Sequence, residues 1–387
     1  MKVLVLHNIV SPHVLPYFDG LAKEAGIELT VWFLDRSTSV RLWETKIDGA
    51  YRWEILPGCR LELPLEERVA LHFNPCVLWR IPREKFDVVV LFAGYDSPTF
   101  WLAALICRIL GIPMVIRSGS VPGSSSFGGN APGLAKLRRR ASRFLVRRIV
   151  RAARSWIAYG SRSKRYLMEL GAHEHRIHMV WNTVRVETLM RQAEETRCCR
   201  QEIRARLGVG AEEVFFLYVG RLQAFKNLGI LIDGFRQVHA QSAVLGIVGY
   251  GPEEAELRRR ASGVANIRFY GAVSLDRISD YYVASDGFVL PSGDIWGLVV
   301  NEAMACGLPV IAANTVGSSE DLIVHGENGY VYPWDDLDAL ANALDRLAGD
   351  AGLRARMGAA SLSRIQRFTY KDAVPEFAAA VREAYNC

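Results

Sequence analysis

The chain has 387 residues, more than one hydrophobic core usually supports, so two domains are expected. Half of the residues are hydrophobic, which excludes a disordered protein. The net charge of +6 is modest for this length, and the 7 cysteines show no C-x-x-C spacing, so we expect free thiols in a reducing compartment. No signal-peptide cleavage site and no apolar run long enough for a membrane-spanning helix are evident.

The first half of the chain alternates apolar runs with helical patterns. Strands are predicted at residues 2–7, 27–33, 87–92, 113–116, 156–159 and 177–180. Helices are predicted at residues 15–25, 98–110 and 164–170. This alternation predicts an open parallel α/β domain. The loop at residues 8–13 lacks the G-x-G-x-x-G fingerprint, which disfavours a dinucleotide oxidoreductase.

Residues 135–156 form a predicted amphipathic helix that concentrates the basic charge. Its apolar stripe comprises Leu134, Leu137, Ala141, Leu145 and Ile149. Its basic stripe comprises Lys136, Arg140, Arg143, Arg147, Arg151 and Arg154. Such a helix suits an anionic membrane, where each basic residue contributes about 1 kcal/mol. Alternatively, the apolar stripe packs on its own domain and the arginines are merely solvated; nucleic-acid binding is disfavoured because no stacking aromatics are interleaved.

The second half opens after a polar stretch, residues 185–199, which we predict to be an interdomain linker. A strand at residues 214–219 leads into a loop with two cations five residues apart, Arg221 and Lys226, and then a helix at residues 228–239. Two cations beside a turn at a strand's carboxyl end suit a diphosphate, although they could also be solvated loop residues. Further strands are predicted at residues 245–248 and 267–270, and a final helix at residues 370–385.

Residues 286–322 carry the most specific pattern in the chain. A strand at residues 287–290, a loop, a helix at residues 298–306 and a strand at residues 309–312 predict a βαβ unit. The loop leads into a helix N-terminus, whose free amides and dipole suit phosphate. Asp294 in the loop and Glu302 one turn into the helix can accept hydrogen bonds from sugar hydroxyls. The alternative is a solvated loop aspartate and an ordinary helix glutamate.

These residues resemble the donor site of the family 4 retaining glycosyltransferases. The family's signature is Glu, seven residues and Glu, followed by Ala-Met and a Gly-x-Pro-Val strand. Here it stands as Asp294, seven residues and Glu302-Ala303-Met304, then Gly307-Leu308-Pro309-Val310. Asp294 therefore replaces the first Glu with a side chain one methylene shorter.

Several short motifs in the first half of the chain resemble those of the bacterial family 4 enzymes that build surface polysaccharides or glycolipids. They are Ser11-Pro12-His13, Pro16-Tyr17-Phe18, Arg41-Leu42-Trp43, Tyr51-Arg52-Trp53, Gly94-Tyr95, Arg117-Ser118 and Gly160-Ser161. The resemblance implies the GT-B fold, an α/β architecture with two Rossmann-like parallel-sheet domains facing across a cleft. The domains would be residues 1–184, which bind acceptor, and residues 200–369, which bind a nucleotide sugar, with a helix at about 370–387 packing back on the first domain.

The resemblance also assigns roles to single residues. Arg221 and Lys226 would hold the donor's phosphates, Asp294 the sugar hydroxyls and Glu302 the ribose. Backbone atoms at Val273 would meet the base. The expected donor-binding residues are Gly220, Arg221, Lys226, Gly249, Val273, Asp294, Trp296, Gly297, Leu298 and Glu302.

The implied chemistry is transfer of a hexose from a UDP- or GDP-sugar with retention of configuration. Neither a metal nor a cofactor is expected, because no D-x-D motif occurs in a suitable loop and the cations take the metal's place. Many relatives carry a His after the strand at residues 113–116, whereas this chain has Arg117. Asp96 and His13 are candidate bases. Equally, Asp96 could be a helix cap and His13 an ordinary loop histidine.

The expected function is transfer to a lipid-linked or growing cell-surface glycan, in exopolysaccharide or lipopolysaccharide synthesis. The protein would be cytoplasmic and peripherally bound to the inner face of the cell membrane through Arg140, Arg143, Arg147 and Arg151. One alternative is a glycosyltransferase with a soluble small-molecule acceptor. Another is a non-catalytic membrane-surface binding protein with a decayed donor domain. A phosphorylase is a poorer option, since no cofactor-lysine motif is evident.

Overall fold

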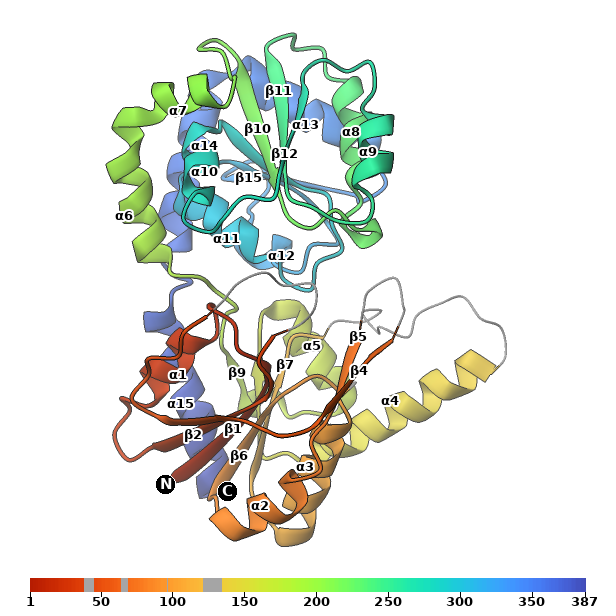
Figure 1. The fold of residues 1–387 in the computed structure, drawn as a ribbon, viewed down its shortest axis with the longest axis vertical. Coiled ribbons are helices and arrows are strands. Elements are labelled where there is room, and N and C mark those ends of the chain that lie inside the picture. Colours follow the sequence, from red (N-terminus) through yellow and green to blue (C-terminus); the bar gives the residue numbers. More distant parts are fainter. Residues whose placement is uncertain (38–44, 64–68, 96, 121–133) are drawn as a thin grey trace. The chain divides into compact units, whose positions relative to one another are not determined.

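The computed structural model describes residues 1–37, 45–63, 69–95, 97–120 and 134–387, without the side chains of residues 62–63, 69–70 and 134–141. The chain divides into two compact units (Figure 1). Unit 1 comprises Met1–Asn182 and Tyr370–Cys387, and unit 2 comprises Thr183–Thr369.

Unit 1 is built on a parallel sheet that, within the described residues, has seven strands in the order β3-β2-β1-β6-β7-β8-β9. The strands are β1 (Lys2–Ile9), β2 (Glu28–Asp35), β3 (Arg52–Ile55), β6 (Val88–Phe92), β7 (Met114–Ser118), β8 (Ser155–Ala158) and β9 (Ile177–Met179). The predicted strands all appear, and β3 is an addition. A separate antiparallel pair, β4 (Cys59–Leu63) and β5 (Val69–Phe73), was also not predicted.

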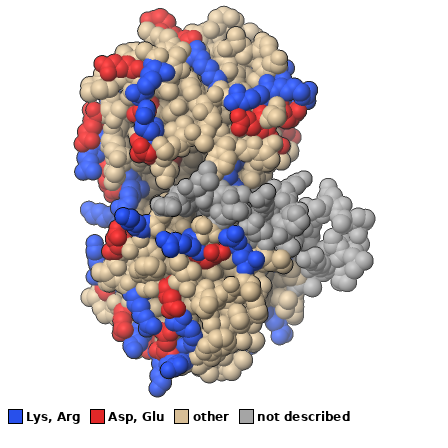
Figure 2. Space-filling view, in the orientation of Figure 1, with Lys and Arg blue, Asp and Glu red and all other residues tan. Residues whose placement is uncertain are grey.

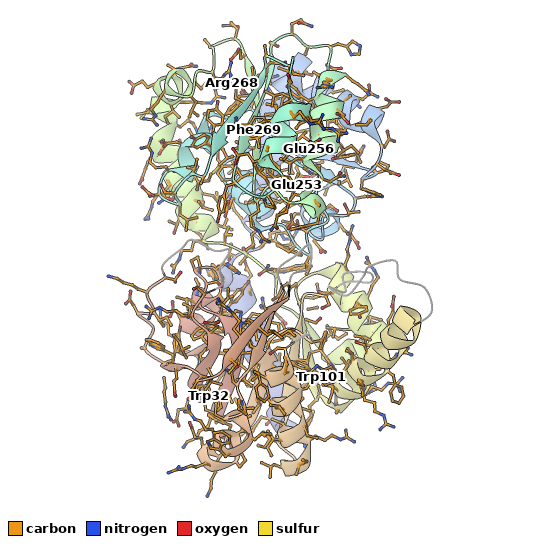
Figure 3. The ribbon with its side chains drawn as sticks, turned by 45° about the vertical axis from the view of Figure 1, so that its right-hand side comes forward. Trp32, Trp101, Glu253, Glu256, Arg268 and Phe269 are labelled. Carbon is orange, nitrogen blue, oxygen red and sulfur yellow. The ribbon has the colours of Figure 1, made fainter. Side chains whose placement is uncertain are left out.

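Helices cover both faces of this sheet. One apolar core joins the strands to α1 (Leu15–Leu21) and α15 (Tyr370–Asn386), so the last helix does pack on the first domain. The other core joins them to α2 (Val77–Glu84), α3 (Pro98–Leu110), α4 (Leu134–Ala152) and α5 (Ser161–Leu170). Trp32 of β2 and Trp101 of α3 lie in unit 1 (Figure 3), and Trp32 packs edge-on against Phe86 in the second core.

The basic helix α4 differs from its prediction in the phase of its apolar stripe. Val146 and Val150 are buried, whereas Leu145 is 52% exposed and Phe144 is 57% exposed. The predicted stripe, which placed Leu145 inward, is therefore wrong at this position. Consecutive apolar residues from 144 to 146 made the phase ambiguous in the sequence.

The predicted arginine stripe of α4 turns toward α5. Arg143 pairs with the Glu169 carboxylate at 3.2 Å, and Arg147 donates to the Glu169 carbonyl at 2.9 Å. The Arg151 side chain lies against Gly171, where an added Cβ would come within 2.5 Å of its Nε. The side chain of Arg140 lies outside the described part of the chain. Arg143, Arg147 and Arg151 therefore have intramolecular contacts, although all three remain exposed.

Unit 2 has a second parallel sheet, of six strands in the described residues, in the order β12-β11-β10-β13-β14-β15. Its strands are β10 (Val214–Val219), β11 (Ala243–Val248), β12 (Ile267–Gly271), β13 (Gly287–Leu290), β14 (Val310–Ala313) and β15 (Gly329–Tyr332). Its helices are α6 (Val186–Thr196), α7 (Arg200–Arg206), α8 (Leu228–Arg236), α9 (Glu254–Arg260), α10 (Ile278–Ala284), α11 (Leu298–Ala305), α12 (Ser319–Leu322), α13 (Leu337–Gly349) and α14 (Ala351–Ile365).

The predicted linker at residues 185–199 is wrong, because this segment is helical and belongs to unit 2. It forms α6 and the short 3₁₀ helix Arg197–Cys199, and α6 packs on α10 and α11. Val186 and Ala193 are buried on its inner side. The chain passes between the units only at residues 182–183 and 369–370, where the Thr183 hydroxyl donates to the carbonyl of Phe368.

Charged side chains of both signs are interspersed on the face of the molecule drawn in Figure 2. Helix α9 is an example. Glu253 and Glu256 mark its beginning (Figure 3), and three arginines occupy its last turn, an arrangement that complements the helix dipole. No helix within the described ranges has both the length and the apolar character needed to cross a bilayer.

Each sheet contains a point where the order of connections reverses. It lies between β1 and β6 in unit 1 and between β10 and β13 in unit 2. In open parallel sheets, ligands bind beyond the carboxyl ends of the strands at such a point. The loops after β10 and β13 are therefore where a site is expected in unit 2.

Candidate functional site

The loops after β10 and β13 are joined directly to each other in unit 2. The backbone N–H of Gly293, after β13, donates to the carbonyl of Phe225, after β10, at 3.0 Å. The two strands are neighbours in the sheet, so their loops start side by side. This junction brings together the segments that hold the predicted cations and the first predicted acid.

Lys226 and Asp294 form a close ion pair at this junction. The Lys226 Nζ lies 2.7 Å from each Asp294 carboxylate oxygen. The side chains are only 10% and 17% exposed, so water screens the pair little. Ser292 also donates its hydroxyl to the Asp294 carboxylate. The carboxylate is thereby fixed in place, while its remaining lone pairs can still accept hydrogen bonds.

Two glycines allow the loops after β10 and β11 to approach closely. Gly249 has a φ of 144°, and a Cβ there would lie 1.8 Å from the Gly220 carbonyl oxygen. The backbone N–H of Gly220 donates to the Val248 carbonyl at 3.0 Å. Any side chain at Gly249 would therefore push the Gly220 segment out of place.

Tyr218, near the end of β10, forms a hydrogen bond with the loop that follows β10. Its hydroxyl donates to the Arg221 carbonyl at 3.0 Å, and the residue is fully buried. Burial, followed by the negative charge of Asp294, raises the pKa of this phenol well above its usual value, so it remains a donor. Sequence reasoning missed Tyr218 because it reads as an ordinary apolar-run residue of a strand.

Replacing Tyr218 with phenylalanine is expected to loosen the Arg221 loop without emptying the core. The change leaves the Arg221 carbonyl without its donor, a loss of about 1 kcal/mol for a neutral hydrogen bond. We expect nucleotide affinity to fall by about threefold to tenfold, measured by calorimetry. Tyr332→Phe, which removes a hydroxyl with no hydrogen-bond partner among the described residues, is the matched control and should change nothing.

Arg221 lies in the same loop, and no hydrogen bond or ion pair of its guanidinium appears among the described residues. Its guanidinium carbon lies 5.9 Å from the centre of the Phe225 ring. Its charge is therefore available to a ligand at the loop, whereas Lys226 shares its charge with Asp294.

The start of α11 is fixed by a third segment. The Gly317 N–H donates to the Asp294 carbonyl at 2.8 Å, and the Ser318 N–H donates to the Trp296 carbonyl at 3.0 Å. Gly297, with a φ of 87°, turns the chain into the helix that begins at Leu298. The Trp296 indole is buried and donates to Asn301 at 3.0 Å. The helix N-terminus and its free amides are thus held beside the Lys226–Asp294 pair.

Glu302 occupies the second turn of α11 and is bonded to a different partner. The Tyr282 hydroxyl donates to its carboxylate at 2.6 Å, and burial raises the pKa of this carboxyl above its usual value. Tyr282, on α10, is a second residue that the sequence did not single out. Val273 follows β12, which is separated from β10 by β11. The structure thus joins Lys226 and Asp294 directly, whereas Glu302 is bonded to Tyr282 and Val273 follows a strand two places from β10 in the sheet.

The structure gives no evidence that the candidate bases of unit 1, Asp96 and His13, are catalytic. Asp96 lies outside the described residues, and the His13 carbonyl accepts a hydrogen bond from the Tyr370 hydroxyl at 2.8 Å. Across the described ranges, no group of three or more His, Cys, Asp or Glu side chains is arranged to hold a metal ion. Independence from metal remains a prediction.

Comparison with known proteins gives a family for each half of the chain. The model described as Glycosyltransferase Family 4 matches residues 12–188, and the model described as Glycosyl transferases group 1 matches residues 213–350. The chain belongs to the family 4 glycosyltransferases. Its two parallel-sheet units are those of the GT-B fold.

Solved structures share this glycosyltransferase fold over the whole chain. The structure of HepE from Anabaena, in complex with UDP and glucose, has a TM-score of 0.72 at 19% identity and covers 99% of both chains. WaaG, a glycosyltransferase involved in lipopolysaccharide biosynthesis, has a TM-score of 0.68 at 16% identity and covers 98% of this chain and 99% of its own.

Two curated relatives of this family 4 glycosyltransferase differ in their named activity. D-inositol 3-phosphate glycosyltransferase of Xylanimonas cellulosilytica is 31% identical over 222 residues, which are 56% of this chain and 52% of the relative. Sulfoquinovosyl transferase SQD2 of Arabidopsis thaliana is 31% identical over 178 residues, which are 45% of this chain and 34% of the relative. The chain thus spans about half the length of the first relative, and less of the second.

Proposed function

We propose that this chain transfers a hexose from a nucleotide sugar, with unit 2 as the donor-binding unit. The observation that carries the proposal is the buried Lys226–Asp294 pair at the junction of the loops after β10 and β13. A cation, a carboxylate and a helix N-terminus at one sheet edge match the phosphates and hydroxyls of such a donor. The bound UDP named for the HepE structures favours UDP over GDP as the carrier.

The proposed chemistry is retaining and independent of metal. Arg221, Lys226 and the first amides of α11 would stabilise the charge that develops on the leaving diphosphate. Asp294 would orient the sugar hydroxyls while it fixes Lys226. A leaving phosphate oxygen on the same face of the sugar can take the proton of the acceptor hydroxyl. This scheme needs no protein nucleophile, and we assign none.

A panel of UDP-, GDP- and dTDP-sugars tests the proposal. We expect slow hydrolysis of one UDP-sugar without added metal, and calorimetric binding of UDP that is stronger than that of GDP. UDP binding should be weaker in Lys226→Met. Absence of affinity for any nucleotide would overturn the proposal and favour a non-catalytic surface-binding protein.

For the acceptor we propose a lipid-linked or growing surface glycan met at a membrane. The support is the outer face of α4, where Phe144 and Leu145 are more than half exposed and the Arg148 guanidinium lies 5.1 Å from the Phe144 ring. Exposed apolar side chains beside cations are suited to the interface of an anionic bilayer. The predicted membrane residues Arg143 and Arg147 contact Glu169 but remain exposed on the same helix.

Replacing Phe144 and Leu145 with serine is expected to weaken binding to anionic vesicles by about tenfold or more, because both side chains lose apolar burial worth about 1.5–3 kcal/mol each at most. Co-sedimentation with vesicles containing phosphatidylglycerol would measure this. Leu105→Ser with Ile109→Ser, on α3 and at least half exposed, is the matched control.

A soluble acceptor is the alternative, favoured by relatives named D-inositol 3-phosphate glycosyltransferase. Equal vesicle binding by the Phe144 and Leu145 double variant and the native chain would remove the membrane proposal. A soluble sugar phosphate would then be the better acceptor to test.

A further inference from the structure

A buried arginine in unit 1 has no partner for its charge among the described residues. Arg117, at the carboxyl end of β7, is only 4% exposed. Its Nε, Nη1 and Nη2 atoms are all buried, and none has a hydrogen-bond partner among the residues that the structure describes. The described carboxylates also form no ion pair with it. Because a guanidinium does not lose its proton in proteins, the positive charge remains.

Aromatic rings surround this guanidinium. Its central carbon lies 3.7 Å from the centre of the Phe92 ring, 4.1 Å from that of Tyr159 and 5.1 Å from that of Tyr17. The planes of Phe92 and Tyr159 meet at 80°, so the guanidinium lies in a corner between two nearly perpendicular rings. Rings attract the charge through their faces but offer no in-plane acceptor for the five N–H groups. Among the described residues, the donors therefore stay unsatisfied.

Unsatisfied donors of this kind are rare in protein interiors. Buried charges are normally paired, and a buried donor without an acceptor destabilises the fold. The native chain nevertheless keeps five such donors on a residue type that binds planar oxyanions through two parallel hydrogen bonds. An oxyanion supplied by a ligand would satisfy them.

The position of Arg117 is also that of a ligand-binding residue. Phe92 ends β6, which pairs in parallel with both β1 and β7, so Arg117 lies at the carboxyl edge next to the reversal point of the sheet. This is the edge at which open α/β sheets bind ligands. Ser11, in the loop after β1, reaches the same edge and carries a buried hydroxyl that likewise has no described partner.

We propose that Arg117 binds a phosphate or carboxylate group of the substrate that unit 1 accepts. The inference rests on the proposed function, in which unit 1 takes the acceptor. The guanidinium would form a bidentate pair with the anion while the three rings fix its orientation, and Ser11 would be a candidate second donor. Acceptors with an anionic group near the reacting hydroxyl would then be preferred over neutral sugars.

The test uses the full chain with UDP at saturation, so that unit 2 cannot take up the probe. Inorganic phosphate and acetate are titrated calorimetrically into the native chain, Arg117→Gln and Arg117→Lys. We expect Arg117→Gln to weaken binding of at least one anion by tenfold or more. Arg117→Lys keeps the charge but loses the planar fork, so it should fall between the two. UDP affinity should be the same in all three proteins.

Substrate arms identify the source of the anion. Glucose 1-phosphate and glucuronate, each compared with glucose, test phosphate and carboxylate acceptors. In each arm, a preference that disappears in Arg117→Gln supports the proposal and names the group.

Unchanged anion affinity in Arg117→Gln would overturn the inference, especially if Arg117→Met raised the melting temperature, since the cation would then be only a packing residue. If the native chain did not bind UDP, the proposed function would be contradicted instead. The two failures are therefore distinguishable.

Discussion

Replacing Lys226 with methionine is expected to reduce turnover by roughly 10²–10³-fold, the usual effect of removing one electrostatic group that stabilises a transition state. Lys226 is the cation held at the junction of the two donor loops, 2.7 Å from both oxygens of Asp294. Its loss removes charge stabilisation of the leaving diphosphate and releases the Asp294 carboxylate. Single-turnover kinetics with the best UDP-sugar would measure the effect.

Measuring the stability of variants at Lys226 and Asp294 distinguishes the structural role of the ion pair from its catalytic role. Lys226→Met and Asp294→Asn each leave one largely buried group without its partner, and each is expected to lower the free energy of unfolding by about 3 kcal/mol. The double variant should recover most of this stability but no activity. Lys164→Met, at the exposed pair with Glu174, is the matched control and should change stability by about 0–1 kcal/mol.

Urea unfolding of the four variants measures these differences. Near-native turnover in Lys226→Met would mean that the pair is structural and that the diphosphate is held elsewhere. Recovery of activity in the double variant would lead to the same conclusion.

Replacing Glu302 with glutamine is expected to weaken UDP binding by about tenfold to a hundredfold. A charged hydrogen bond to a ribose hydroxyl contributes about 1.5–3 kcal/mol, and the amide retains only the neutral part of it. The amide oxygen can still accept from Tyr282, so α11 keeps its packing. Calorimetry with UDP and with free uracil, which lacks the ribose, distinguishes loss of the ribose contact from a general loss of binding.

The same variant should change the pH dependence of stability. Burial raises the pKa of the Glu302 carboxyl above its ordinary value of 4.5, so the folded state holds this proton more tightly than the unfolded state. The contribution of this group to stability is therefore fully present below pH 4.5 and is lost as the pH rises through the raised folded pKa.

Glu302→Gln removes this dependence. We expect its melting temperature to exceed that of the native chain at pH 8 and to equal it near pH 4. A variant that is less stable than the native chain at pH 8 would contradict the assignment of a destabilising buried charge.

Much of the fold could be predicted because buried parallel strands appear as short apolar runs between turn residues. The strands at residues 214–219 and 287–290 have the predicted bounds. The β4–β5 pair escaped prediction because its sequence, including CRLEL, mixes charged and apolar residues. The sequence of α6 predicts a linker because few of its residues are apolar and its inner side is narrow.

The candidate site was less predictable than the fold. Charged residues in loops after strands are visible in a sequence, which is why Lys226 and Asp294 were found. Tyr218, Ser292 and Tyr282 were missed because they contact the site through single hydroxyls from otherwise ordinary core positions. The sequence marks Arg117 as part of a family-like motif and as a departure from the His of many relatives, but not as an unpaired charge. Its unsatisfied charge depends on three rings from separate segments, which spacing along the chain does not reveal.

Because α15 belongs to unit 1, unit 1 is completed later in synthesis than unit 2. The α15 residues Ala373, Phe377 and Val381 complete the core of unit 1, although the rest of that unit ends at Asn182. Unit 2 can therefore fold as soon as its residues have been synthesised. In unit 1, part of one apolar face of the sheet stays uncovered until α15 has been synthesised. A chain stopped shortly before Tyr370 would contain a complete unit 2 joined to an incomplete and aggregation-prone unit 1.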